Sequence, residues 1–431
     1  MRLSAQLSPK EEKDIAEKPT DNLEAYDLYL QAKQLQNKVA LWGSEKENYL
    51  KAVVLLEQAI QKDHQFALAY CQIAKAHDFL YSQQMDATAE RRALGDAAVN
   101  EALRLRPDLS QVHLAVAFHL YTCYHDYERA HVQITMAAQA LPNDPGLLEL
   151  TASIDQVQGR WEQATAGLEK AASRDPRNVE LLEDLAWNYW CQRRYRDYDR
   201  ILDRLIELEP DQPGFPARKE RSVFAEKADL KDVRAAYEAL PSSTKDDPEV
   251  TFFRVYYAMC ARDFGAAQQI VNESPKDELG FFGALVPRQI VALWIEFVRG
   301  NHPTMEQFGS AREQLNRKVE GDRTNPHLMT AIALADVALG RNEDGMKEGR
   351  RAMEMRPISE DAVDGPFIAA DVALVYAWAN GPDFALEQLK TLAQIPNYRV
   401  TYGDLKTYPG WDPLRKDPRF QKLVAKLAPR E

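Results

Sequence analysis

Four of the eight histidines lie at regular six-residue intervals, and this spacing first suggests metal chemistry. They are His113, His119, His125 and His131. Imidazole is a common metal ligand, but six residues of α-helix rotate by about 600°, so successive members of the series face different directions. His125 also falls in an expected turn, and His131 on the following helix. We therefore interpret them as ordinary surface or core histidines and predict no metal site, because metal ligands must converge with supporting partners.

Motifs that carry catalysis or cofactor binding are absent from the sequence. It contains neither of the two glycine-rich phosphate-binding motifs, G-x-x-x-x-G-K-[ST] and G-x-G-x-x-G. It also has no nucleophile elbow, no zinc-protease motif and no EF-hand loop. The four cysteines lie 52, 68 and 69 residues apart without a C-x-x-C pair, which predicts buried, reduced thiols. We expect a protein that is not an enzyme and needs no cofactor. A hydrolase or transferase with a site between helices is the rival class, and it would require a deep pocket with perturbed carboxylates.

Two tryptophans beside a run of arginines form the most conspicuous candidate for binding. Trp187 and Trp190 have large contact areas and lose little rotamer entropy on binding. The arginines that follow are Arg193, Arg194, Arg196, Arg200 and Arg204. The tryptophans either hold a peptide or pack against neighbouring helices. For the arginines we favour a solvated face balanced by Glu183, Asp197 and Asp203 over a contact with phosphate or an acidic peptide.

Composition and charge limit the possible partners. The net charge is −12 and the pI is about 5.3, so no basic surface is evident and we expect no binding of nucleic acid. Anionic membranes are disfavoured for the same reason, and no apolar run approaches the roughly 18 residues that span a bilayer. The polar N-terminus lacks a signal core. We expect a cytoplasmic protein, with the alternative of a soluble, periplasm-facing part of a membrane-anchored protein, and a protein or peptide as partner.

Three sets of residues recur with one period of about 34 residues. Prolines that end apolar helical segments lie 35, 34 and 34 residues apart at Pro107, Pro142, Pro176 and Pro210. Aromatic residues recur at the same period at Tyr127, Trp161 and Tyr195. Small residues that let two helices touch recur as Ala130 with Ala137 and Ala164 with Ala171. Coincident periods of this length are typical of a helical repeat.

The segment from Pro145 to Pro176 resembles the tetratricopeptide repeat (TPR) family, whose unit is a helix–turn–helix of 34 residues. Gly159 marks the turn, and Ala164, Leu168 and Ala171 line the second helix. The resemblance implies an all-α fold, a right-handed α-solenoid of about ten TPR-like helical hairpins. One such hairpin cannot bury its own apolar face, so neighbouring hairpins must stack to form the core.

The repeat pattern predicts four segments along the chain. They are an N-terminal lead-in over 1–21, an array with a clear period over 22–212, a degenerate array over 213–396 and a C-terminal capping segment over 397–431. In the lead-in, Ser8 and Glu11 have the spacing of a capping box and predict a short helix. In the capping segment, Trp411 and Phe420 are expected to cover the last hairpin.

The TPR resemblance also implies a set of partner-binding residues. In that family, positions two, five, nine, twelve and thirteen of the first helix of each hairpin line a concave groove that holds a peptide. In this chain the positions fall on Lys75, Asp78, Ala115, His119, Thr122, Glu149, Ser153, Gln156, Glu180, Glu183, Trp187, Trp190 and Cys191. If the groove assignment is right, Trp187→Ala with Trp190→Ala should abolish partner capture without loss of the fold.

The two ends resemble a narrower group. The segments LSPKEEKDIAEKPTDNLEAYDLYLQAK and YPGWDPLRKDPRFQKLVAKL are similar to the junctions and ends of the TPR halves of large bacterial proteins. Those proteins carry a TolB-like domain, a nucleotide cyclase or a serine/threonine kinase domain upstream. The resemblance implies a scaffold or, alternatively, the regulatory half of a signalling protein, and the sequence leaves the oligomeric state open.

Overall fold

The computed structural model describes residues 19–36, 45–83, 85–86 and 88–429. They divide into two compact units: unit 1 comprises 1–155 and 162–184, and unit 2 comprises 156–161 and 185–431. The segment boundaries after residues 21, 212 and 396 stay predictions. The helix expected around Ser8 lies outside the described residues.

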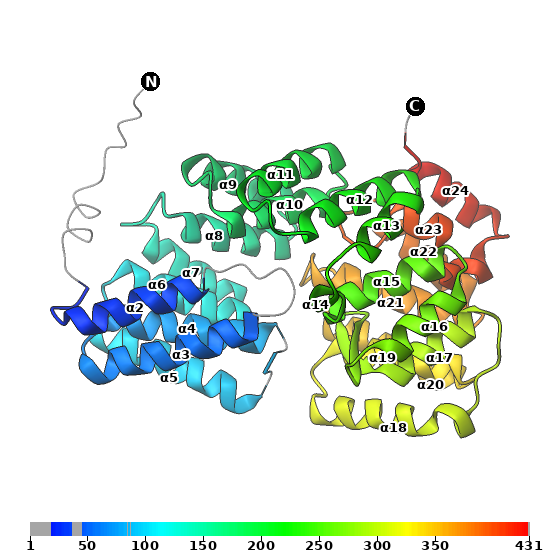
Figure 1. The fold of residues 1–431 in the computed structure, drawn as a ribbon, viewed down its shortest axis with the longest axis horizontal. Helices are drawn as coiled ribbons and strands as arrows, with labels where there is room; N and C mark the ends of the chain where they lie inside the picture. The colour runs from blue at the N-terminus through cyan, green and yellow to red at the C-terminus, as the bar shows by residue number, and fades with distance from the viewer. Residues whose placement is uncertain (1–18, 37–44, 84, 87, 430–431) are drawn as a thin grey trace. The chain divides into compact units, whose positions relative to one another are not determined.

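The helices of the first half run in sequence order through the blue, cyan and blue-green parts of the ribbon (Figure 1). They are α2 (Leu23–Gln36), α3 (Glu45–Lys62), α4 (Ala67–Ser82), α5 (Ala89–Leu105), α6 (Ser110–His119), the π-helical turn η1 (Leu120–Tyr124), α7 (Tyr127–Ala137), α8 (Pro145–Val157), α9 (Trp161–Arg174) and α10 (Val179–Cys191). Helices α2 to α7 belong to unit 1, whereas α8, α9 and α10 each contribute residues to both units.

The remaining elements all lie in unit 2. They are α11 (Tyr195–Leu208), α12 (Gly214–Lys227), α13 (Lys231–Glu238), α14 (Ser242–Lys245), α15 (Pro248–Cys260), α16 (Phe264–Glu273), β1 (Glu278–Phe281), β2 (Ala284–Pro287), α17 (Arg288–Val298), α18 (Met305–Gly321), α19 (Pro326–Ala338), α20 (Asn342–Met355), α21 (Asp364–Trp378), α22 (Pro382–Leu392), α23 (Tyr402–Thr407), the 3₁₀ turn η2 (Pro409–Leu414) and α24 (Pro418–Leu427).

The described helices pair into ten successive hairpins, from α2–α3 to α21–α22, with the short α14 outside the pairs. The recurring aromatic residues mark the hairpins, because Tyr127, Trp161 and Tyr195 are the first residues of α7, α9 and α11. Phe264 begins α16 in the same way. The predicted all-α helical-repeat solenoid is therefore confirmed, and the recurring aromatic residues mark the start of four of its second helices.

Small side chains in the second helices form the contact surface of the hairpins. The alanines singled out by the repeat, Ala130, Ala137, Ala164 and Ala171, have no exposed surface. A methyl group lets two helix backbones approach closely, and the longer side chains between them fill the remaining space. Ile134 and Leu168 occupy those intervening places and are also buried. All four cysteines are free and buried, as predicted.

The antiparallel hairpin of β1 and β2 was not expected from the sequence. Its strands pair Phe281 with Ala284 across a two-residue turn of Phe282 and Gly283. Both turn residues have positive φ, 50° and 73°, a conformation that asparagine or aspartate usually supplies at the first position. Phe282 adopts it because its ring is buried against Trp294, with 5.1 Å between ring centroids. Tertiary packing rather than turn propensity therefore determines this hairpin.

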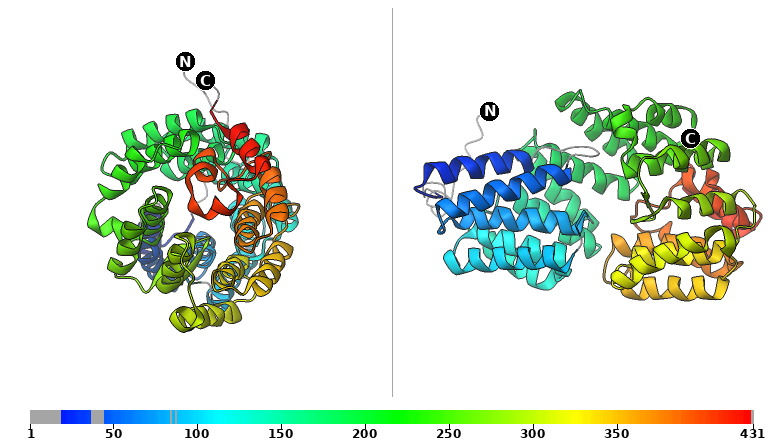
Figure 2. Two further views of the ribbon diagram at one scale, coloured as in Figure 1. Left: turned by 90° about the vertical axis from the view of Figure 1, so that its right-hand side faces the viewer. Right: turned by 60° about the horizontal axis from the view of Figure 1, so that its bottom comes forward.

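The C-terminal segment packs onto the last hairpin of unit 2, since η2 contacts α21 and α24 contacts α22. Trp411 and Phe420 are buried, and Asp417 caps α24 directly before its first-turn proline. The segment also reaches helices far earlier in the sequence, because α23 contacts α12 within this unit (Figure 2). The hydroxyl of Tyr256 on α15 donates a 2.6 Å hydrogen bond to Asp404 on α23. The cap therefore joins both ends of the unit 2 array.

Candidate functional site

Side chains from four successive first helices meet on one face of unit 1. Lys75 on α4 reaches Glu180 on α10, with 4.0 Å between Nζ and Oε1, although α6 and α8 lie between these helices in the sequence. The same ammonium lies 5.8 Å from the centre of the Phe118 ring on α6. Glu149 on α8 and Asp184 on α10 share a side-chain hydrogen bond beside it. We call Lys75, Glu149, Glu180 and Asp184 the inner-face cluster.

Two carboxyl groups of this cluster, those of Glu149 and Asp184, resist ionisation. Burial, and then the charge of Glu180, raise the pKa of Glu149 to about 7, against the partial compensation by Lys75. Burial and the nearby Glu149 and Glu180 also raise the pKa of Asp184. Two carboxyl groups can share a hydrogen bond only when one of them holds the proton. Near neutral pH the pair Glu149–Asp184 therefore shares a proton, and a bound cation would replace it.

The raised pKa of Glu149 predicts a pH-dependent stability of unit 1. An acid with a raised folded-state pKa holds more protons folded than unfolded, so its contribution to stability is lost as pH rises from about 4.5 through about 7. Glu149→Gln should flatten this slope and stabilise the protein at pH 8 by about 1 kcal/mol, less than the full shift implies because Glu149 is partly exposed. Urea unfolding at pH 5 and pH 8 measures the effect. Glu162→Gln, an exposed change on α9, is the control, and equal slopes for both variants would contradict the prediction.

The structure divides the predicted partner-binding residues into two groups. The partly exposed ones are Lys75, Ala115, Thr122, Glu149, Ser153, Glu180, Glu183 and Trp187. The buried ones are Asp78, His119, Gln156 and Trp190, together with Cys191. The inner-face cluster adds Asp184, which the family positions did not include although it follows Glu183 directly.

Burial of the second group follows from the contact between adjacent first helices. Position twelve is Asp78, Gln156 or Trp190 in three of the hairpins, and each side chain touches the first helix of the next one. Asp78 pairs with His119 on α6 at 2.7 Å. The amide of Gln156 donates to Asn188 on α10 at 3.0 Å. These residues lie between neighbouring hairpins, so they do not line an open groove, and that part of the groove assignment is corrected.

The two tryptophans belong to the packing of unit 2. Trp190 is 4% exposed, and its Nε1–H donates to the Tyr398 carbonyl oxygen at 3.3 Å. Arg221 lies 4.3 Å above its ring. Trp187 is partly exposed, but its ring centroid lies 4.6 Å from that of Tyr398. The packing alternative, which the sequence left open, therefore describes Trp190.

The arginine run is only partly the solvated face that the sequence suggested. Arg194 and Arg200 are exposed and both donate to Asp197, at 2.7 and 2.8 Å. Arg193 instead turns inward, where its guanidinium donates to the carbonyl oxygens of Leu392, Ile395 and Val400 at 2.9–3.2 Å. Its backbone has a φ of 57°, which directs the side chain away from the line of its neighbours.

Unit 2 contains a cavity, which is the kind of site that a hydrolase or transferase acting between helices would need. Its volume is about 270 Å³ and its lining includes Tyr237, Glu238, Arg254, Tyr257 and Glu273. Both oxygens of Glu238 accept hydrogen bonds from the Arg254 guanidinium, at 3.0 and 3.1 Å. An ion-paired carboxylate of this kind is held as a hydrogen-bond acceptor, so it is poorly suited to act as a general base.

Within the residues that the structure describes, no helix has the length and apolar character needed to cross a membrane.

Comparison with known proteins finds similar solved structures but no matching family. No family model and no curated protein matches the chain. Among solved structures, it is similar to the human IFIT1 dimer with PPP-AAAA, with 15% identity and a TM-score of 0.46 over 72% of this chain and 69% of that one. Yeast Tom70 shares 12% identity with a TM-score of 0.33 over 94% and 92%. YrrB, a TPR protein with an unusual peptide-binding site, shares 15% identity with a TM-score of 0.26 over 48% and 94%. The chain has a TPR-like fold.

One prediction about partners is wrong. The net charge predicted no binding of nucleic acid, but the similar IFIT1 structures contain PPP-AAAA or Gppp-AAAA. A net charge averages over the whole surface, whereas binding depends on the local potential at one site. Nucleic acids are therefore no longer excluded as partners.

Proposed function

We propose that this chain is a non-catalytic binding scaffold whose inner face on unit 1 holds a lysine- or arginine-bearing segment of a protein partner. The observation that carries the proposal is the meeting of side chains from α4, α6, α8 and α10 on one face, shown by the approach of Lys75 to Glu180. A segment lying there would touch four hairpins at once. Repeat arrays commonly use such extended faces for binding.

The charges of the inner-face cluster select the chemistry of the partner. Three carboxyl groups surround one ammonium, and burial together with repulsion from Glu180 raises the pKa of Glu149 to about 7. A cationic side chain between Glu149 and Asp184 would remove this repulsion and release the shared proton. Affinity should therefore rise between pH 5 and pH 8. The same carboxylates would repel a phosphate group at this one face.

Fluorescence anisotropy with labelled peptides tests this proposal. Peptides rich in lysine and arginine, an acidic peptide and a 5′-triphosphate oligoadenylate are titrated against the wild type and a double variant of Glu149→Gln with Asp184→Asn. The basic peptides should bind in a salt-dependent manner, and the double variant should weaken them about tenfold or more. The control is Glu128→Gln with Glu162→Gln, which changes the net charge equally at exposed positions of α7 and α9.

Three outcomes would count against the proposal. They are the absence of binding by any basic peptide, an equal loss in the control variant, and preference for the oligonucleotide. The narrower alternative, the regulatory half of a kinase- or cyclase-linked protein, depends on the two end segments and stays a prediction. An open reading frame that extends upstream of Met1 into such a domain would support it.

A further inference from the structure

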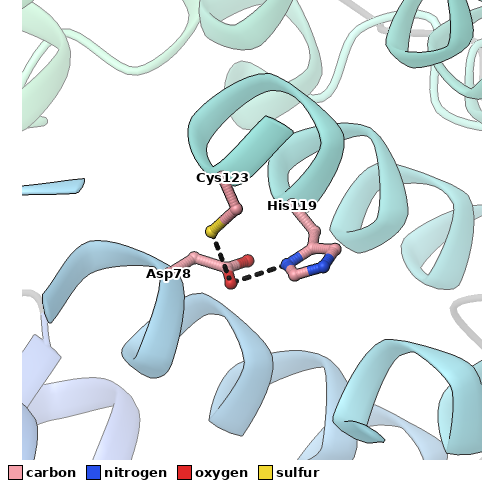
Figure 3. Close-up of side chains that lie close together, drawn as sticks. All are labelled: Asp78, His119 and Cys123. Carbon is pink, nitrogen blue, oxygen red and sulfur yellow. Dashed lines mark hydrogen bonds and ion pairs between the residues drawn. The ribbon is translucent and has the colours of Figure 1, made fainter. Parts of the chain in front are cut away.

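Three side chains of different chemistry converge inside unit 1 (Figure 3). Asp78 projects from α4, while His119 ends α6 and Cys123 lies in the π-helical turn η1. The imidazole Nδ1 lies 2.7 Å from Asp78 Oδ1, and the Cys123 thiol donates to the same oxygen at 3.3 Å. One donor atom from each residue lies within 4.8 Å of the others. The three side chains are 1–4% exposed.

A second carboxylate fixes the orientation of the imidazole. His119 Nε2 lies 3.0 Å from Asp96 Oδ1, and the Tyr124 hydroxyl donates to both oxygens of Asp96 at 2.8 and 2.9 Å. Histidines that bind metals usually donate their other ring N–H to a carboxylate, which sets the tautomer and orients the ring. With Nε2–H donated to Asp96, Nδ1 points toward Asp78, and its lone pair is open to an ion once the proton between Nδ1 and Asp78 leaves.

Two further observations point to a ligand between these side chains. Asp78 Oδ2 is buried and has no hydrogen-bond partner among the described atoms, although an orphaned buried carboxylate oxygen costs free energy. At Gly95 on α5, an added Cβ would lie 2.5 Å from Asp78 Oδ1 and 3.3 Å from His119 Nδ1. The glycine therefore lets α5 close over the two donor atoms. The π-helical turn places Cys123 beside them, and such turns are frequent at functional sites.

We propose that Asp78, His119 and Cys123 form a Zn²⁺ site, with Asp96 as the partner that orients His119. A thiolate, an imidazole and a carboxylate together suit a borderline ion such as Zn²⁺ and are unsuited to Mg²⁺ or Ca²⁺. Binding replaces the thiol proton of Cys123 and the proton that Nδ1 shares with Asp78, and both are released to solvent. The bonds formed join Zn²⁺ to Asp78, to Nδ1 and to the thiolate, and water completes the tetrahedron.

An ion at this site would have a structural role, and two neighbouring side chains reach the surface. Asp78 belongs to the second hairpin, whereas His119 and Cys123 belong to the third, so the ion would cross-link two neighbouring hairpins of unit 1. Above the three ligands, the side chain of Asp96 is 37% exposed and that of Tyr124 lies at the surface. This site is independent of the proposed peptide-binding face, so either can fail without the other.

Cobalt substitution tests the proposal. The full chain is stripped with a chelator and titrated with Co²⁺, which gives visible bands in tetrahedral sites and a thiolate charge-transfer band in the near ultraviolet. We expect one equivalent per chain, displaced by Zn²⁺, with the charge-transfer band lost in Cys123→Ser and kept in Cys71→Ser, a buried cysteine of α4. Asp96→Asn should weaken binding about 10–100-fold with the band retained.

An unfolded variant would also lose the charge-transfer band. Each variant is therefore first checked for native helical content by circular dichroism. The wild-type titration needs no variant. Failure of the stripped wild type to bind Co²⁺ or Zn²⁺ would overturn the proposal, as would a charge-transfer band that persists in Cys123→Ser. Weak uptake that is equal in wild type and Cys123→Ser would also overturn it, because it would show surface binding only.

Discussion

Arg193→Met should destabilise unit 2 by about 2–4 kcal/mol, although the residue lies in a run of arginines that otherwise faces solvent. The guanidinium of Arg193 donates to three backbone carbonyl groups in the segment 392–400. Methionine fills similar volume but donates nothing. The Val400 carbonyl oxygen would lose both of its bonds to Arg193, whereas Leu392 and Ile395 would keep their bonds from the Asn397 amide.

The measurement combines overall and local stability. Guanidinium unfolding followed by circular dichroism gives the loss of stability, and hydrogen exchange shows where it arises. We expect faster exchange in 392–400, where the Asn397 N–H donates to the Cys191 carbonyl oxygen at 2.8 Å. Arg193→Lys should recover little, because an ammonium cannot reproduce the planar fork that reaches three acceptors. Arg196→Met, an exposed change nearby, is the matched control, and equal losses in the two methionine variants would refute the assigned role.

Trp190→Ala should cost about 3–5 kcal/mol, the range for truncating a buried large aromatic residue. The indole is 4% exposed and packs against Tyr195 and Tyr198, with ring centroids 5.4 and 5.2 Å away. Its removal leaves a cavity, removes the cation–π contact of Arg221 and leaves the Tyr398 carbonyl oxygen without its indole donor. This expectation reverses the one based on the sequence, in which the double tryptophan variant kept its stability.

Trp190→Phe separates packing from the hydrogen bond. The phenyl ring keeps much of the contact with the two tyrosines but lacks the N–H, so we expect a smaller loss of about 1–2 kcal/mol. Trp187→Ala should also cost less than Trp190→Ala, since Trp187 is partly exposed. Denaturant unfolding of the three variants gives the order. A Trp190→Ala protein as stable as the wild type would contradict the packing role assigned to Trp190.

The periodicity of the sequence predicted the class of fold. The recurrence of Tyr127, Trp161 and Tyr195 indicated the period of the hairpins, and the small residues Ala130 and Ala164 marked helix contacts that are buried in the structure. These features repeat within about 34 residues, so a single hairpin already contains the information. The exception is the β1–β2 hairpin, whose Phe282–Gly283 turn depends on burial of an aromatic ring against Trp294.

The candidate sites depended on distances that no local pattern contains. The first helix of each hairpin was identified correctly, but its period alone does not say whether a position faces solvent or the next hairpin. Position twelve is buried at Asp78, Gln156 and Trp190 because the following first helix covers it. The six-residue histidine series likewise gave no indication of a site, since the partners of His119 are Asp78, Asp96 and Cys123 rather than other histidines.

The sequence by itself therefore determined the class of fold, the order of the hairpins and which small residues lie between paired helices. Only the tertiary structure decided that Arg193 points into unit 2, that Lys75 meets Glu180, and that Asp78 meets His119 and Cys123. The physical reason is the range of the interactions. Helix periodicity and turns arise from residues a few positions apart, whereas burial and charge pairing arise between hairpins whose stacking brings distant residues into contact.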